Sequence, residues 1–261
     1  MSYSLFSADQ NPEFRVGVVK PFECLGGGWS LIKDQYFLFA GFCLIILVLV
    51  SCIPFAGIIW GAWMCGIFLG LFGKMRGEFV SFNTIGKGFS FVGPGFVVAI
   101  LSGLPFVVVA VGGKLFELWM DEIDRAYPGD EGVPPEVLMQ MLTYLAGLVL
   151  LYVFCFLVTG VIFAFAYQLV VDKNLSGWEA TKLSARAARE NFGGVMGLLL
   201  LELALSTLGI MMCCFGLVLV MPLTKASWAI AYSQAFLPTP QPIPAPQPPP
   251  PPVFYGNAAG Q

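Results

Sequence analysis

Two ionisable residues lie inside apolar stretches of this 261-residue chain and are the strongest candidates for chemistry. Glu202 lies about nine residues into one apolar run, and Lys225 about eleven residues from the end of the next. In a membrane, both would be roughly 13–17 Å deep. Charges at that depth are costly and are usually paired. We therefore predict a Glu202–Lys225 ion pair that serves either as a structural lock or as a relay for a proton or a substrate.

A proline in the same run as Lys225 adds to this candidate site. Pro222 removes a backbone hydrogen bond from its helix and frees a carbonyl group. A free carbonyl near Lys225 is compatible with a polar cavity, although transmembrane prolines are also common without one.

The residues needed for most other chemistry are missing. The sequence has no histidine, which is the commonest metal ligand and the usual general base near neutral pH. Most of its seven cysteines lie in apolar runs without C-x-x-C spacing, so we interpret them as buried, reduced thiols. There is also no nucleophile–base pair and no phosphate-binding loop. We predict no catalytic residue, no metal site and no cofactor.

The composition indicates a membrane protein. Hydrophobic residues make up 57% of the chain and charged residues 11%, and the mean hydropathy is +0.81. A soluble domain carries about 25% charged residues. The net charge of −3 gives no basic field that would attract nucleic acid. We predict an all-α fold, a polytopic membrane helical bundle.

Six apolar runs have roughly the 20-residue length that a membrane-crossing helix needs. We predict about six transmembrane helices, arranged as three hairpins. The runs are Tyr36–Ile53, Phe55–Gly73, Gly95–Leu118, 136–171, Gly194–Met212 and 217–236.

The distribution of lysine and arginine predicts the orientation. Ten of the 13 cations lie in the N-terminal segment and in the connections before the third and fifth runs. The opposite side has only Lys114 and Arg125, and its loop 119–135 is acidic. This loop does not match a calcium-binding pattern, so we expect a solvated loop. The bias places both termini in the cytoplasm. Residues 1–16 do not resemble a signal peptide, so we expect the first transmembrane helix to direct insertion.

Three segments, which precede the first, third and fifth runs, share an apolar spacing of 3, 4, 3 and 4 residues. This spacing places five side chains on one stripe of a helix, with aromatic ends that suit the headgroup depth. We interpret each segment as an interfacial amphipathic helix and the three as an internal repeat, although such spacing also arises by chance in an apolar chain. The stripes are Phe22, Leu25, Trp29, Ile32 and Tyr36; Phe82, Ile85, Phe89, Val92 and Phe96; and Trp178, Thr181, Ala185, Ala188 and Phe192.

The polar faces of these three helices differ. The third carries a basic strip of Lys182, Arg186 and Arg189, and Ser176 with Glu179 predicts a capping box at its start. Glycines in the first segment, and glycines with a proline in the second, predict that these two helices are broken.

The repeat divides the chain into three regions. A polar segment covers residues 1–16, a membrane domain with repeats of about 17–73, 79–171 and 176–236 covers 17–236, and a proline-rich cytoplasmic tail covers 237–261. The tail favours polyproline II and is either disordered or a docking peptide for an aromatic groove on a partner. Its candidate docking residues are Pro248, Pro252, Phe254 and Tyr255.

Glycines in the second run follow a small-xxx-small pattern. Gly57 with Gly61, and Gly66 with Gly70, fit the spacing for close helix packing, and a pore lining is the alternative.

Two stretches carry a resemblance to a known family. The stretch Gly61–Glu78 with Phe82 and Gly88–Phe89, and the stretch Asp172–Phe192 with its Trp178–Ser184 core, resemble bacterial multipass proteins of unknown function. These are similar to the membrane domain attached to some glycerophosphodiester phosphodiesterases. The resemblance implies a helical bundle in the bacterial inner membrane. It carries over no catalytic residue, because this chain has no phosphodiesterase domain.

These features favour a non-enzymatic role. We expect a scaffold or an accessory subunit of a larger membrane assembly, with membrane lipids as partners at the interfacial helices and a possible protein partner at the tail. The alternative is a transporter or channel-like protein for a lipid or small amphiphile that uses Glu202 and Lys225. The sequence does not predict an oligomeric state.

Overall fold

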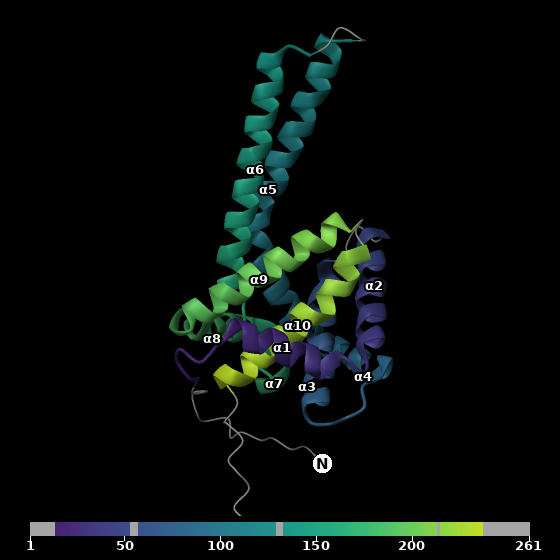
Figure 1. The fold of residues 1–261 in the computed structure, drawn as a ribbon, viewed down its shortest axis with the longest axis vertical. Coiled ribbons are helices and arrows are strands. Elements are labelled where there is room, and N and C mark those ends of the chain that lie inside the picture. Colours follow the sequence, from purple (N-terminus) through teal and green to yellow (C-terminus); the bar gives the residue numbers. More distant parts are fainter. Residues whose placement is uncertain (1–13, 53–56, 129–132, 213–214, 237–261) are drawn as a thin grey trace, which may run out of the picture.

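The computed structural model describes residues 14–52, 57–128, 133–212 and 215–236, and these residues are helical without any strand (Figure 1). This confirms the all-α class. The helices in chain order are α1 (Pro21–Ile32), α2 (Tyr36–Cys52), α3 (Gly57–Met75), α4 (Phe82–Gly86), the 3₁₀ helix η1 (Lys87–Phe91), α5 (Val92–Ala126), α6 (Pro135–Ile162), α7 (Ala166–Lys173), α8 (Gly177–Glu190), α9 (Phe192–Met211) and α10 (Phe215–Phe236).

Three helical stretches are long and apolar enough to cross a membrane, namely Phe82–Ala126, Pro135–Lys173 and Phe192–Met211. The pair α1 and α2, bent by 99°, adds a fourth if it is counted as one span. A coarse membrane-protein fold is therefore present, while the six crossings are not established by length and composition. The predicted fourth run is interrupted, because α6 ends at Ile162 and α7 begins at Ala166.

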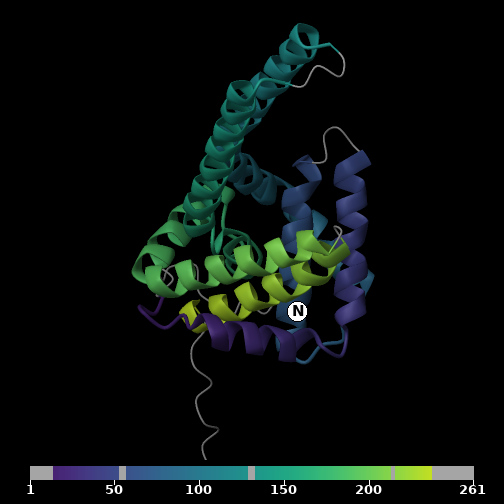
Figure 2. The same cartoon turned by 45° about the horizontal axis from the view of Figure 1, so that its top comes forward.

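The α5–α6 pair dominates the shape of the molecule. Both helices stand side by side and extend well past the remaining helices, whereas α9 and α10 run obliquely across their foot (Figures 1 and 2). With 35 residues, α5 is about 52 Å long, which exceeds the roughly 30 Å hydrocarbon core of a bilayer. The far end of this pair therefore reaches beyond the hydrocarbon core if α5 enters it near Val92.

Each of the three helical segments predicted to be interfacial (α1, α4 with η1, and α8) packs against helices of the preceding group of elements. The pair α4 and η1 packs on α3, and α8 packs on α5, α6 and α7. The first short helix, α1, packs on the last helix, α10 (Figure 2). The chain is thereby closed into a ring of contacts in which its first and last helices meet.

Close crossings in this ring occur at small residues. A Cβ atom on Gly28 of α1 would lie 2.7 Å from the Ser227 backbone nitrogen of α10. A Cβ on Gly88 of η1 would lie 2.3 Å from the Cα of Gly66 in α3. In α8, the Ser184 hydroxyl accepts a 2.9 Å hydrogen bond from the Phe165 backbone N–H. In each of the three segments, the residue directly before the third stripe residue is therefore small and buried. These residues are Gly28, Gly88 and Ser184.

The glycines in α1 do not break it, contrary to the sequence-based prediction. The helix runs without interruption from Pro21 to Ile32, since Gly28 gains close packing against α10 in exchange for its poor helix propensity. The second segment is broken, as predicted, into α4 and η1.

Glycines in α3 serve packing. A Cβ on Gly61 would lie 2.2 Å from the Gly95 carbonyl oxygen of α5, and one on Gly66 would lie 2.4 Å from the Ile85 carbonyl oxygen. These contacts confirm the packing interpretation for Gly61 and Gly66. The side-chain surroundings of Gly57 lie outside the described residues, so its packing stays a prediction.

An aromatic cluster fills the centre where the ends of α3, α7 and α10 converge. Tyr232 of α10 lies 5.4 Å from Phe72 of α3 and 6.3 Å from Phe165, measured between ring centroids. Its hydroxyl donates a 2.6 Å hydrogen bond to Asp172 of α7. Tyr232 is fully buried, so one side chain ties three groups of elements together.

We predict that Gly28→Ala lowers the melting temperature in detergent. The added methyl group would meet the α10 backbone, and overpacking of this kind costs about 1–3 kcal/mol. Gly26→Ala is the matched control, because no atom lies within 4 Å of its Cβ position and alanine favours a helix. Equal melting temperatures for the two variants would contradict the close crossing of α1 and α10.

Candidate functional site

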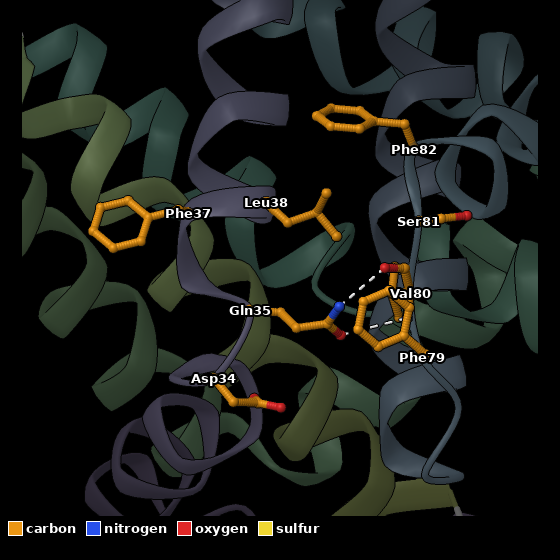
Figure 3. Close-up of a pocket in the computed structure, with 8 residues that line it drawn as sticks. All are labelled: Asp34, Gln35, Phe37, Leu38, Phe79, Val80, Ser81 and Phe82. Carbon is orange, nitrogen blue, oxygen red and sulfur yellow. Dashed lines mark hydrogen bonds between the residues drawn. The ribbon is translucent and has the colours of Figure 1, made fainter.

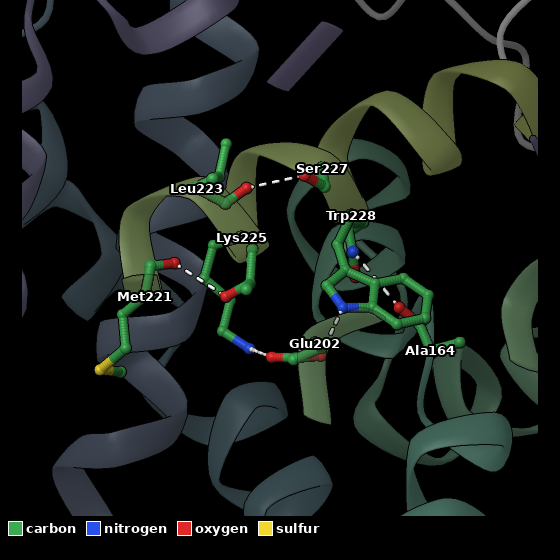
Figure 4. Close-up of polar contacts among 9 residues, drawn as sticks. Ala164, Glu202, Met221, Leu223, Lys225, Ser227 and Trp228 are labelled. Carbon is green, nitrogen blue, oxygen red and sulfur yellow. Dashed lines mark hydrogen bonds and ion pairs between the residues drawn. The ribbon is translucent and has the colours of Figure 1, made fainter. Parts of the chain in front are cut away.

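Glu202 in α9 and Lys225 in α10 lie in direct contact. The Lys225 ammonium group is 2.8 Å from Glu202 Oε1, and the two side chains are 17% and 14% exposed (Figure 4). Trp228 donates its indole N–H to Glu202 Oε2 over 2.7 Å. Both carboxylate oxygens therefore have a donor from α10, which ties α9 and α10 together through three side chains.

Trp228 was not singled out by the sequence reasoning. It follows Lys225 by three residues and so lies on the same face of α10, where a second donor for Glu202 would be expected. This spacing was the signal that could have identified it.

Pro222 lies inside α10, as the sequence indicated. In the turn before it, the Leu219 carbonyl accepts a hydrogen bond from the Tyr36 hydroxyl at the start of α2. The backbone around this proline is therefore used for a contact between α2 and α10. This contact favours packing over an open cavity.

The predicted stripe aromatics lie mainly on the surface. Phe22, at 77% exposed, is the most exposed of them. Most of the aromatic ends thus face outward, whereas the buried side of each short helix includes inner stripe residues, such as Ile32 in α1, Ile85 in α4 and Ala188 in α8. Of the predicted set, Phe22, Trp29, Phe82, Phe89, Trp178 and Phe192 are exposed, and Tyr36 and Phe96 are half-buried.

The third short helix, α8, has the predicted capping box. Ser176 Oγ accepts from the Glu179 backbone N–H over 3.3 Å and donates to the Glu179 carboxylate over 2.7 Å. These bonds hold the pKa of Glu179 below its ordinary value. The Lys182 ammonium group lies 5.7 Å from the centre of the Trp178 ring, in cation–π range. Lys182, Arg186 and Arg189 are all exposed.

Two side-chain amides hold extended segments to the ring. The Gln35 amide donates to the Val80 carbonyl over 3.0 Å and accepts from the Val80 N–H over 3.4 Å (Figure 3). Asn191 likewise accepts from the Val18 N–H over 3.0 Å and donates to the Arg15 carbonyl over 2.8 Å. Each amide directly precedes the last aromatic residue of its stripe and holds the segment that leads into another short helix.

A surface pocket of about 410 Å³ opens beside Gln35 (Figure 3). Its polar part contains Asp34, whose pKa is held below its ordinary value by a hydrogen bond from Lys74. Its apolar part includes the strongly exposed Phe37 and Phe79. This pocket and a second one, at Met139 and Tyr144 on α6, do not include Glu202 or Lys225 among their lining residues.

In the described part of the chain, no group of three or more acidic or cysteine side chains is placed to hold a metal ion. Cys24, Cys43, Cys65 and Cys155 are free and buried, as the interpretation of apolar thiols expected. The tail docking residues Pro248, Pro252, Phe254 and Tyr255 lie outside the described residues.

The chain shows no match to protein-family models, to curated proteins or to solved structures.

We predict that Glu202→Gln and Lys225→Met each destabilise the protein by about 3–5 kcal/mol, because each leaves one buried charge without its partner. The double variant should recover much of the loss. Thermal unfolding of all four proteins in detergent gives the coupling energy between the two sites. If both single variants unfold like the wild type, the ion pair does not stabilise the fold.

Proposed function

We propose that this protein is a non-enzymatic integral membrane scaffold or an accessory subunit of a larger membrane assembly. The observation that carries the proposal is the hydrogen bonding of the Glu202 carboxylate. Both of its oxygens are bound within the fold, by Lys225 and Trp228, and neither pocket described above reaches them. This carboxylate therefore joins two helices, and its bonding capacity is used within the fold.

The exposed surface of α5 and α6 supports the membrane location. Only 11% of the most apolar window of the Phe82–Ala126 stretch is buried, and 22% of that of Pro135–Lys173. Large side chains such as Leu104, Val108 and Leu150 point outward. An apolar surface of this extent is stable in lipid and not in water.

The ring of contacts supports the finer arrangement of three hairpin units, each led by an interfacial helix. In this proposal the units are residues of about 17–73, 79–171 and 176–236, and every short helix packs on the last helix of the preceding unit. The hydrogen bonds from the side-chain amides of Gln35 and Asn191, each directly before the last residue of its stripe, fit the same arrangement. The proposal takes six crossings with cytoplasmic termini from the cation distribution, and a bacterial inner membrane from the resemblance of Gly61–Glu78 and Asp172–Phe192.

A transporter or channel-like protein for a small amphiphile is the second candidate. The partial exposure of Glu202 and Lys225, together with Pro222 nearby in α10, favours it. A relay would require the ion pair to open during each cycle, which the second bond to Glu202, from Trp228, opposes.

Cysteine labelling in intact cells tests the topology. Glu122→Cys, in the exposed far end of α5, should react with a membrane-impermeant maleimide. Arg186→Cys, on the exposed face of α8, should react only after permeabilisation. The wild-type chain controls for its own cysteines. Equal labelling of both variants in intact cells would place them on one side and overturn the six-crossing arrangement.

The scaffold role predicts a stable assembly. Extraction of the full chain in native-lipid discs should yield one defined partner in fixed ratio. The Glu202→Gln/Lys225→Met double variant, which removes both charges of a relay, should keep this partner. Recovery of the 28.3 kDa chain with no other protein, together with transport in sealed proteoliposomes that the double variant abolishes, would favour the transporter.

A further inference from the structure

The outward face of α8 differs from those of the other two short helices in its charge. Lys182, Arg186 and Arg189 follow one another along this face, between the exposed Trp178 and Phe192. The opposite face is packed against the protein through small residues, including Ala180, Ser184 and Ala187. The helix therefore cannot turn its cations inward without losing its packing.

The cations of this face form no ion pair in the described part of the chain, where no acidic side chain lies within ion-pair distance of Lys182, Arg186 or Arg189. The acidic residues of α8 are Glu179, which Ser176 engages in the capping box, and Glu190, which is exposed next to Arg189. Three cations against two acids leave the helix with a net positive charge, so an external anion would stabilise the face.

The other short helices do not offer such a face. On α1, Lys20 is paired with Glu23 at 2.9 Å. The α4–η1 stretch contains a single cation, Lys87. All three short helices lie at the end of the molecule opposite the α5–α6 tip (Figure 1). If that end meets the cytoplasmic leaflet, α8 is the one of these three segments with the most cations at headgroup depth.

We propose that the outward face of α8 binds the headgroups of anionic phospholipids in the cytoplasmic leaflet. Guanidinium groups of Arg186 and Arg189 form paired hydrogen bonds with phosphate oxygens, and Lys182 supplies a third charge. Trp178 and Phe192 anchor the two ends of the helix in the interface, as aromatic residues do at that depth. This inference rests on the proposed membrane scaffold, because it needs α8 to lie at the membrane surface.

The lipid preference is measured with Trp178 as the reporter. The full-length protein is reconstituted in vesicles that contain either brominated phosphatidylglycerol or brominated phosphatidylcholine at equal mole fraction. The fluorescence of a Trp178→Phe variant is subtracted, which isolates this indole from the other five tryptophans. We expect stronger quenching by the anionic lipid, and we expect Lys182→Gln/Arg186→Gln/Arg189→Gln to reduce its relative affinity on the order of tenfold.

The matched control removes three cations from the same side of the molecule but from the other short helices and their ends. Lys20→Gln/Lys33→Gln/Lys87→Gln changes the net charge by the same amount, and all three positions are exposed. The control should keep the preference of Trp178 for the anionic lipid. Equal losses in both triple variants, or no preference in the wild type, would overturn the α8 site. Absence of quenching by either lipid would instead place α8 outside the membrane, and the proposed interfacial helices would fail with it.

Discussion

The rest of this structure depends on close helix crossings at positions that have almost no side chain. Gly28 on α10, Gly88 on α3 and Gly177 on Pro94 each bring two backbones together where a methyl group would not fit. In lipid, the hydrophobic effect does not drive apolar helices together, so close van der Waals packing has to supply much of the association energy. Because the Gly28 crossing joins the first helix to the last, the ring closes only when the whole membrane domain has been made.

Polar groups then fix the positions of the helices that these crossings bring together. The carboxylate of Glu202 ties α9 to α10, and the Tyr232 hydroxyl ties α10 to α7. The amides of Gln35 and Asn191 hold the extended segments before α4 and α1, whose backbone groups would otherwise lack partners. Hydrogen bonds of this kind are directional, so they select one register among the many that apolar side chains alone would tolerate.

Local features of the structure were largely predictable, and long-range ones were not. The α-helical class, the ends of α2 and α9 to within two residues and the Ser176 capping box follow from periodicity and capping rules. The contact of Glu202 with Lys225 follows from their similar depth in neighbouring runs. The packing of α1 on α10 was not predicted, because spacing within a segment carries no information on its partner. The prediction that α1 is broken at its glycines was wrong for the same reason, because the tertiary contact at Gly28 outweighs the low helix propensity of glycine.

The differences among the three proposed units lie on their outward surfaces. Inward positions, such as Gly28, Gly88 and Ser184, are held to small residues by the crossing that each must accommodate. Outward positions are free of this constraint, and there the units diverge: the second extends α5 and α6 well past the other helices to an end rich in acidic residues, and the third carries the cations of α8. A ring that fixes its interior in this way can present two oppositely charged surfaces at its two ends. For the proposed scaffold, these two surfaces are the places where partners would bind.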